Sequence, residues 1–98
     1  MVTNIITFRL KPDAVEQLQA VYAKHFAHLR ERGERIDGYE VWQNKNEPTE
    51  IVTIKRFATR ADEQAHHGSK ELRQFVEDLR ALSAEGAKFR EVELLTAL

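Results

Sequence analysis

Four stretches of the chain have the hydrophobic patterns of β-strands. Residues 2–10 alternate, and every second position carries the more apolar side chain: Val2, Asn4, Ile6, Phe8 and Leu10. A period of two is typical of a strand that turns one face to a core. Residues 36–44 also alternate, whereas residues 51–57 carry apolar groups on both faces, which predicts burial on both sides. Residues 89–95 are predicted to form a closing strand.

Two stretches repeat apolar residues every three or four positions, which is the pattern of amphipathic helices. The first lies between Asp13, whose spacing to Glu16 resembles a capping box, and Gly33. Its apolar stripe consists of Val15, Leu18, Tyr22, His25 and Leu29. The second helix is predicted to end near Gly86, and its stripe consists of Leu72, Phe75, Val76, Leu79 and Leu82.

A short third helix is predicted directly after the strand 51–57. Thr59 is a good N-cap, because its hydroxyl can accept a hydrogen bond from an unpaired amide of the first turn. Two adjacent histidines end this helix, and Gly68 is expected to close it in the left-handed conformation. Ser69 is then expected to cap the long helix that follows.

These elements, apart from the short helix, follow one another as βαββαβ. Residues 44–49 have the composition of a turn, so the strands on either side are expected to pair as an antiparallel hairpin. This order predicts a ferredoxin-like α+β fold, in which a four-stranded antiparallel sheet carries both long helices on one face. A second copy of the chain is the expected cover for the other face.

Length and composition predict one small domain over residues 1–98. The chain has no cysteine, which excludes disulfides, thiol catalysis and thiolate metal sites. Its 15 basic and 16 acidic residues are interspersed, so we expect no binding to nucleic acid or to a membrane surface. We recognise neither an apolar run long enough to span a membrane nor a secretory leader, so the cytoplasm is the expected compartment.

Four segments carry a family resemblance: Phe8–Pro12, Gly38–Trp42, the strand 51–57 and the corner Ala65–Ser69. Their order and spacing resemble the antibiotic-biosynthesis monooxygenase (ABM) domain family over essentially the whole chain. The family usually has tryptophan at the position of Phe57, where this chain keeps an aromatic ring. The resemblance implies a dimeric α+β barrel, in which two sheets pack together in a homodimer and each subunit has a pocket between sheet and helices.

The resemblance also implies candidate site residues. His66 matches a position where many ABM sequences have histidine, so it is the candidate catalytic base. A small aromatic substrate is expected to contact Asn4, Ile6, Phe8, Tyr22, His25, Phe57 and Phe75. The alternatives are that the corner histidine only ties the backbone together, and that Tyr22 and His25 form a satisfied core pair. Trp42 is expected either in the pocket or at the dimer interface.

Two main functions remain open. The first is oxidation of a small aromatic, phenolic or quinol substrate by O2 without a metal or flavin cofactor, which the resemblance implies for some family members. The second is a non-catalytic dimer that binds a small apolar ligand. An open cavity with converging polar groups favours the first function, and a solid aromatic core favours the second.

We rank haem binding and metal binding below these two functions. The haem-degrading branch of the family uses an asparagine on the first strand, a tryptophan on the short helix and a histidine on the last helix. Here Asn4 is offset by one alternation, and His66 and Val76 fall at the tryptophan and histidine positions. His25 and His28 lack a third ligand at a supporting spacing, so no metal site is predicted.

Overall fold

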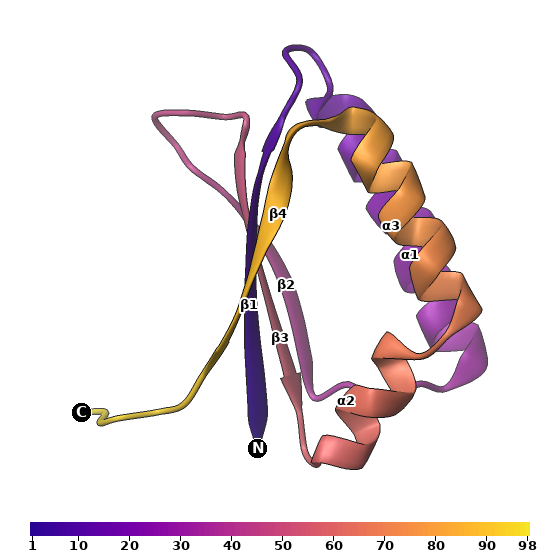
Figure 1. Cartoon of the computed structure of the whole chain (residues 1–98), viewed down its shortest axis with the longest axis vertical. Coiled ribbons are helices and arrows are strands. Elements are labelled where there is room, and N and C mark those ends of the chain that lie inside the picture. The colour runs from indigo at the N-terminus through magenta and orange to yellow at the C-terminus, as the bar shows by residue number, and fades with distance from the viewer.

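A four-stranded antiparallel sheet with three helices on one face makes up the computed structural model, which describes residues 1–98 (Figure 1). The elements in chain order are β1 (Val2–Leu10), α1 (Val15–Arg32), β2 (Gly38–Gln43), β3 (Glu50–Phe57), α2 (Arg60–His67), α3 (Lys70–Leu82) and β4 (Ser83–Val92). The strands lie in the order β2-β3-β1-β4. The predicted ferredoxin-like α+β fold is therefore confirmed. None of the helices is both long and apolar enough to cross a bilayer.

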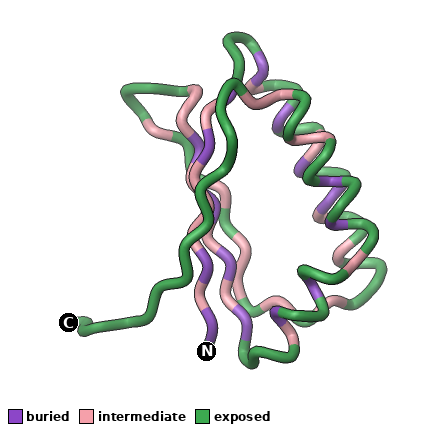
Figure 2. Tube along the Cα trace, in the orientation of Figure 1, coloured by how far each residue is buried: buried purple, intermediate pink, exposed green.

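Strand β1 lies inside the sheet, so its alternation decides which of its side chains reach the interior. It pairs with β3 on one side and with β4 on the other. Val2, Asn4, Phe8 and Leu10 are buried, as the alternation predicts, while the positions between them are only partly covered. Figure 2 shows these buried segments alternating with less buried ones along the strands. One face of the sheet therefore packs beneath the helices.

The apolar core lies between that face and the two long helices. Its buried members come from both layers: Phe8, Leu10, Ala14, Leu18, Tyr22, Ile51, Leu72 and Phe75. The predicted stripes of both helices supply several of these side chains, which explains why α1 and α3 lie side by side on the sheet (Figure 1).

Two helix starts and one helix end follow the sequence prediction. Thr59 Oγ1 accepts a hydrogen bond from the Asp62 backbone N–H at 3.1 Å, and Ser69 Oγ accepts one from the Leu72 N–H at 3.1 Å. Gly33 ends α1 in the left-handed conformation, with a φ of 62°. These caps define where α2 and α3 begin, and so where the two histidines lie.

The predicted cap at Asp13 and the predicted conformation of Gly68 are wrong, although Gly68 does end α2. Asp13 does not cap α1, because the N-cap position belongs to Ala14 and the Asp13 backbone itself turns through a φ of 68°. A backbone hydrogen bond from the Ala14 N–H to the Lys11 carbonyl at 3.2 Å closes this turn instead. Gly68 has a right-handed φ of −85°, and its N–H bonds to the Gln64 carbonyl at 3.0 Å. The chain therefore passes from α2 into α3 without a left-handed residue.

Helix α3 ends at Leu82, four residues before the predicted end near Gly86. Ser83 is already extended, with a φ of −90° and a ψ of 137°, and pairs with Leu10 of β1. The alanines and glutamate that follow favour helix locally, but pairing with a strand inside the sheet outweighs that preference. The last strand therefore begins earlier and ends earlier than the predicted residues 89–95.

Replacing Leu10 by alanine is expected to lower the free energy of unfolding by about 2–5 kcal/mol, because the removed side chain leaves a cavity in the core. Leu10 is 1% exposed, whereas Leu98 is fully exposed. Urea unfolding followed by circular dichroism measures the change. Leu98→Ala is the matched control and should change stability by less than about 0.5 kcal/mol. Equal destabilisation by the two variants would contradict this core.

Candidate functional site

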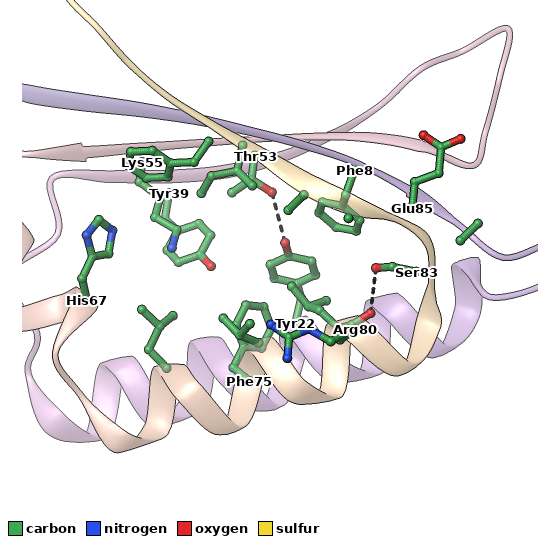
Figure 3. A pocket seen from close by; sticks show the side chains of 18 residues that line it. Phe8, Tyr22, Tyr39, Thr53, Lys55, His67, Phe75, Arg80, Ser83 and Glu85 are labelled. Atoms are coloured by element: carbon green, nitrogen blue, oxygen red, sulfur yellow. Dashed lines mark hydrogen bonds between the residues drawn. The ribbon is translucent and has the colours of Figure 1, made fainter.

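A cavity of about 580 Å³ lies between the sheet and α3 (Figure 3). Small-molecule sites typically measure about 300–1,000 Å³, so this volume suits a small organic ligand. Apolar side chains from several elements make most of the wall: Ile6, Phe8, Leu72, Phe75, Val76, Leu79 and Phe89. The polar side chains of the lining are Tyr22, Tyr39, Thr53, Lys55, His67, Arg80, Ser83 and Glu85.

The structure brings together part of the predicted binding set. Four of its members line the cavity: Ile6, Phe8, Tyr22 and Phe75. Three others are buried outside the lining: Asn4, His25 and Phe57. His66, the predicted base, is 2% exposed and also lies outside the lining, whereas its neighbour His67 belongs to it. A substrate in the cavity would thus meet His66 only through an intervening side chain.

Lys55 is that intervening side chain. It lies on the inner face of β3, is 4% exposed and lines the cavity (Figure 3). Its Nζ is 3.0 Å from His66 Nε2 and 5.0 Å from the centroid of the Tyr39 ring. Burial lowers the pKa of the Lys55 amine to about 8, although Glu34 acts in the opposite direction. The amine therefore changes its protonation state close to neutral pH.

Sequence reasoning missed Lys55, although one signal could have found it. Ile51, Thr53, Lys55 and Phe57 alternate along β3, and all four are buried. A lysine at a buried, inward position of a strand is unusual, because its desolvation costs free energy.

Glu34 completes a hydrogen-bonded chain that begins at Lys55. His66 Nδ1 is 3.0 Å from Glu34 Oε1. A carboxylate only accepts hydrogen bonds, so Nδ1–H donates to Glu34 and Nε2 is left to accept from the Lys55 amine. Burial, and then the charge of Lys55, lower the pKa of His66 to about 3, which keeps this imidazole neutral. On the other side, Glu34 Oε2 lies 2.8 Å from the Arg32 guanidinium.

Two hydroxyls form a second polar group in the wall. Tyr22 Oη and Thr53 Oγ1 are 3.0 Å apart and both residues are buried. One of the two hydroxyl protons makes this hydrogen bond, so the other is available to a ligand. Burial raises the pKa of Tyr22 to about 12, which keeps the phenol protonated.

The remaining predicted residues support the wall from behind. His25 Nε2 is 3.1 Å from Tyr39 Oη, and the His25 ring stacks on Phe75 with centroids 3.7 Å apart. Burial is the main cause that lowers the pKa of His25 to about 3. Asn4 Nδ2 is 3.5 Å from His67 Nε2, and Asn4 Oδ1 is buried without a hydrogen-bond partner.

The arrangement favours binding of an oxyanion at an apolar surface. An amine and a free hydroxyl proton face the cavity, and the surrounding walls exclude water, which strengthens their electrostatic attraction to a negative oxygen. No group of three or more histidine, cysteine, aspartate or glutamate side chains has a geometry that could hold a metal ion.

Acidification is expected to destabilise the fold through His25 and His66. Their pKa values in the folded state, about 3, lie below the value of about 6.5 for an unfolded chain. The unfolded chain binds more protons between these limits, so stability is complete above about pH 6.5 and falls as the pH drops toward 3. Each histidine adds a slope of at most about 1.4 kcal/mol per pH unit.

Urea unfolding at a series of pH values measures this slope. His66→Gln should flatten it, because the variant has no imidazole to protonate, whereas replacement of the exposed His28 by glutamine serves as the matched control. An unchanged slope in His66→Gln would contradict a buried neutral imidazole.

Comparisons with known proteins agree with this fold. The family model described as "Antibiotic biosynthesis monooxygenase" matches residues 1–78. No curated protein matches the chain significantly. One similar solved structure is described as an antibiotic biosynthesis monooxygenase. It is 17% identical to this chain, the alignment covers 98% of this chain and 100% of that one, and the TM-score is 0.83. Another is Rv0793 from Mycobacterium tuberculosis. It is 20% identical, the alignment covers 98% of this chain and 96% of that one, and the TM-score is 0.80.

A conserved protein from Methanosarcina mazei Go1 is also similar, with 13% identity, 93% of this chain and 89% of that chain covered and a TM-score of 0.80. At these identities the structural likeness concerns the fold alone. The family match is different, because it spans most of the sequence, including the whole of β1 to α2. The chain belongs to the antibiotic biosynthesis monooxygenase family.

Proposed function

We propose that the protein is a monooxygenase that oxidises a small phenolic or quinol substrate with O2, without a metal or flavin, in the cavity between sheet and helices. The observation that carries this proposal is the buried amine of Lys55 in the wall of a mostly apolar cavity. A phenolate is the electron-rich form of such a substrate. A cation in a water-poor site stabilises that form.

The substrate itself supplies the electrons for this reaction. A phenol with a hydrogen at the para carbon loses its hydroxyl proton, and that carbon then forms a C–O bond with O2 to give a hydroperoxide. The C–H and O–O bonds break, one oxygen atom stays as the second carbonyl of a quinone, and the other leaves as water. Phenol and O2 thus become quinone and water, and the substrate provides all four electrons.

Each polar group has a role in this proposal. Lys55 binds the phenolate oxygen, and the free proton of the Tyr22–Thr53 hydroxyl pair donates a second hydrogen bond. His66 acts through Lys55, because its Nε2 accepts from the amine and its Nδ1–H reaches Glu34. The proton that the substrate releases therefore has a path from Lys55 toward the partly exposed Glu34.

Oxygen uptake with a panel of quinols and polycyclic phenols tests the reaction. Lys55→Met is expected to lower kcat/KM by about 100-fold, because it removes the group that stabilises the developing anion. Lys45→Met, in an exposed turn, is the matched control and should keep the wild-type rate. His66→Gln should lower the rate and also shift its pH profile.

Two results would overturn parts of this proposal. Full activity in Lys55→Met would remove Lys55 from the mechanism. Tight binding of the same phenols with no oxygen uptake by the wild type would favour the alternative, a non-catalytic protein that binds a small apolar ligand.

A homodimer is part of the same proposal. Only 16 of the 98 residues are buried in the single chain, and the sheet face away from the helices is open (Figure 1). That face carries apolar cross-strand pairs, with Ile5 opposite Ile54 and Trp42 opposite Val52. Trp42 is 57% exposed and lies outside the lining of the main cavity, which favours its role as an interface residue. A second copy packed on this face would remove this apolar surface from water.

Light scattering coupled to size-exclusion chromatography tests the dimer. The wild type should have the mass of two chains, and Ile54→Arg should have the mass of one, because it places a charge in the centre of the proposed interface. Arg73→Ala, on the exposed face of α3, is the control and should stay dimeric. A wild type that is monomeric at micromolar concentration would contradict the proposal.

A further inference from the structure

Lys55 differs from every other lysine of the chain in its surroundings. It is 4% exposed and its side chain extends from β3 into the space beneath the helices, beside Tyr39 (Figure 3). The remaining lysines are all exposed: Lys11, Lys24, Lys45, Lys70 and Lys88. The chain thus places a single primary amine in the wall of a cavity that can hold a small organic molecule.

We infer that Lys55 is a carbonyl-reactive residue, whose amine condenses with a small aromatic aldehyde or ketone in the cavity to form an imine. Desolvated lysines in apolar pockets are the lysines that form such adducts. This covalent capture uses the same cavity as the proposed oxidation but needs neither O2 nor a phenol.

The amine is held in a geometry that suits nucleophilic attack. His66 Nε2 accepts one hydrogen bond from Lys55 Nζ at 3.0 Å, which leaves the other positions of the nitrogen free to face the cavity. Titratable groups surround it on several elements: His66 and His67 on α2, Tyr39 on β2, His25 on α1 and Glu34 after α1. Glu34 is the carboxylate of this set and reaches the amine only through His66, so no anion binds the amine directly.

The condensation needs only the amine, the carbonyl compound and hydrogen-bonding groups of the cavity wall. The nitrogen lone pair of Lys55 forms a C–N bond to the carbonyl carbon, and the excess amine proton passes to the former carbonyl oxygen, giving a carbinolamine. The C–O bond then breaks, water leaves, and the C=N bond of the imine forms. His66 Nε2 stays neutral and orients the amine by accepting a hydrogen bond from it, and the free proton of the Tyr22–Thr53 pair can bond to the carbonyl oxygen.

The groups that would meet the carbonyl lie on one face of the sheet. Thr53 and Lys55 are two residues apart on β3, which separates their Cα atoms by about 7 Å, and both side chains line the same cavity.

Reductive trapping in the intact protein tests the inference. The protein is incubated with 2-naphthaldehyde and sodium cyanoborohydride at about pH 7.5, and peptide mass spectrometry follows the labelling of each lysine. Lys55 should be labelled at least about tenfold faster than Lys45, because burial lowers the pKa of the Lys55 amine and it lies in the cavity that holds the aldehyde. The labelling rate of Lys55 should rise with pH around a midpoint of about 8, the value to which burial lowers its pKa.

Two controls separate a site from general reactivity. Added 2-naphthol, which has no carbonyl, should compete for the cavity and slow the labelling of Lys55 but not of Lys45. Lys55→Arg should lose the fast phase of labelling altogether. Labelling of Lys55 no faster than that of Lys45, or no protection by 2-naphthol, would overturn the inference.

The trapping experiment and the oxygen-uptake experiment test the two proposals separately. Fast trapping without oxygen uptake supports the imine and removes the monooxygenase proposal. Oxygen uptake without fast trapping limits Lys55 to binding of the anion and overturns the imine.

Discussion

The burial of the Lys55 amine is the constraint on which the candidate site depends. A lysine that is 4% exposed costs free energy unless its amine is hydrogen-bonded. His66 supplies that bond, and Glu34 holds His66 in the tautomer that can accept it. The chain of three side chains joins β3, α2 and the loop after α1, so the polar end of the cavity is fixed by three separate elements. Removing any one partner leaves a buried polar group without its bond.

The remainder of the cavity results from differences in side-chain size. Large rings stand on the sheet and on α3, where Phe8 and Phe75 form firm walls. At the start of β4 most of the lining residues are small, namely Ser83, Ala84, Gly86 and Ala87, with Glu85 among them. Protein interiors are otherwise close-packed, so a run of small side chains opposite large ones leaves space that a ligand can fill. The early end of α3 therefore shapes the cavity, because it brings these small residues into the sheet.

The two polar groups of the wall divide the chemistry between them. The Tyr22–Thr53 pair offers a neutral donor that stays protonated, since burial raises the pKa of Tyr22. Lys55 changes its charge near neutral pH and has an exit for its proton toward Glu34. Both proposals use this combination. Oxidation needs the charged amine to hold an anion, and imine formation needs the neutral amine to attack a carbonyl.

The layers of the fold can be predicted from the order of apolar and polar residues. Alternation in residues 2–10 and the helical stripes through Tyr22 and Phe75 identify the side chains that face the core, because these periods follow from backbone geometry alone. In residues 51–57 both faces carry apolar groups, so the inward face of that strand was settled only by its pairing in the sheet. Local hydrogen bonding likewise predicted the caps at Thr59 and Ser69. The end of α3, the place of His66 behind the cavity wall and the place of Lys55 within it depend on contacts between distant segments. The partners of His66 are 11 and 32 positions away in the sequence, and no local pattern records which distant side chains meet in a buried space.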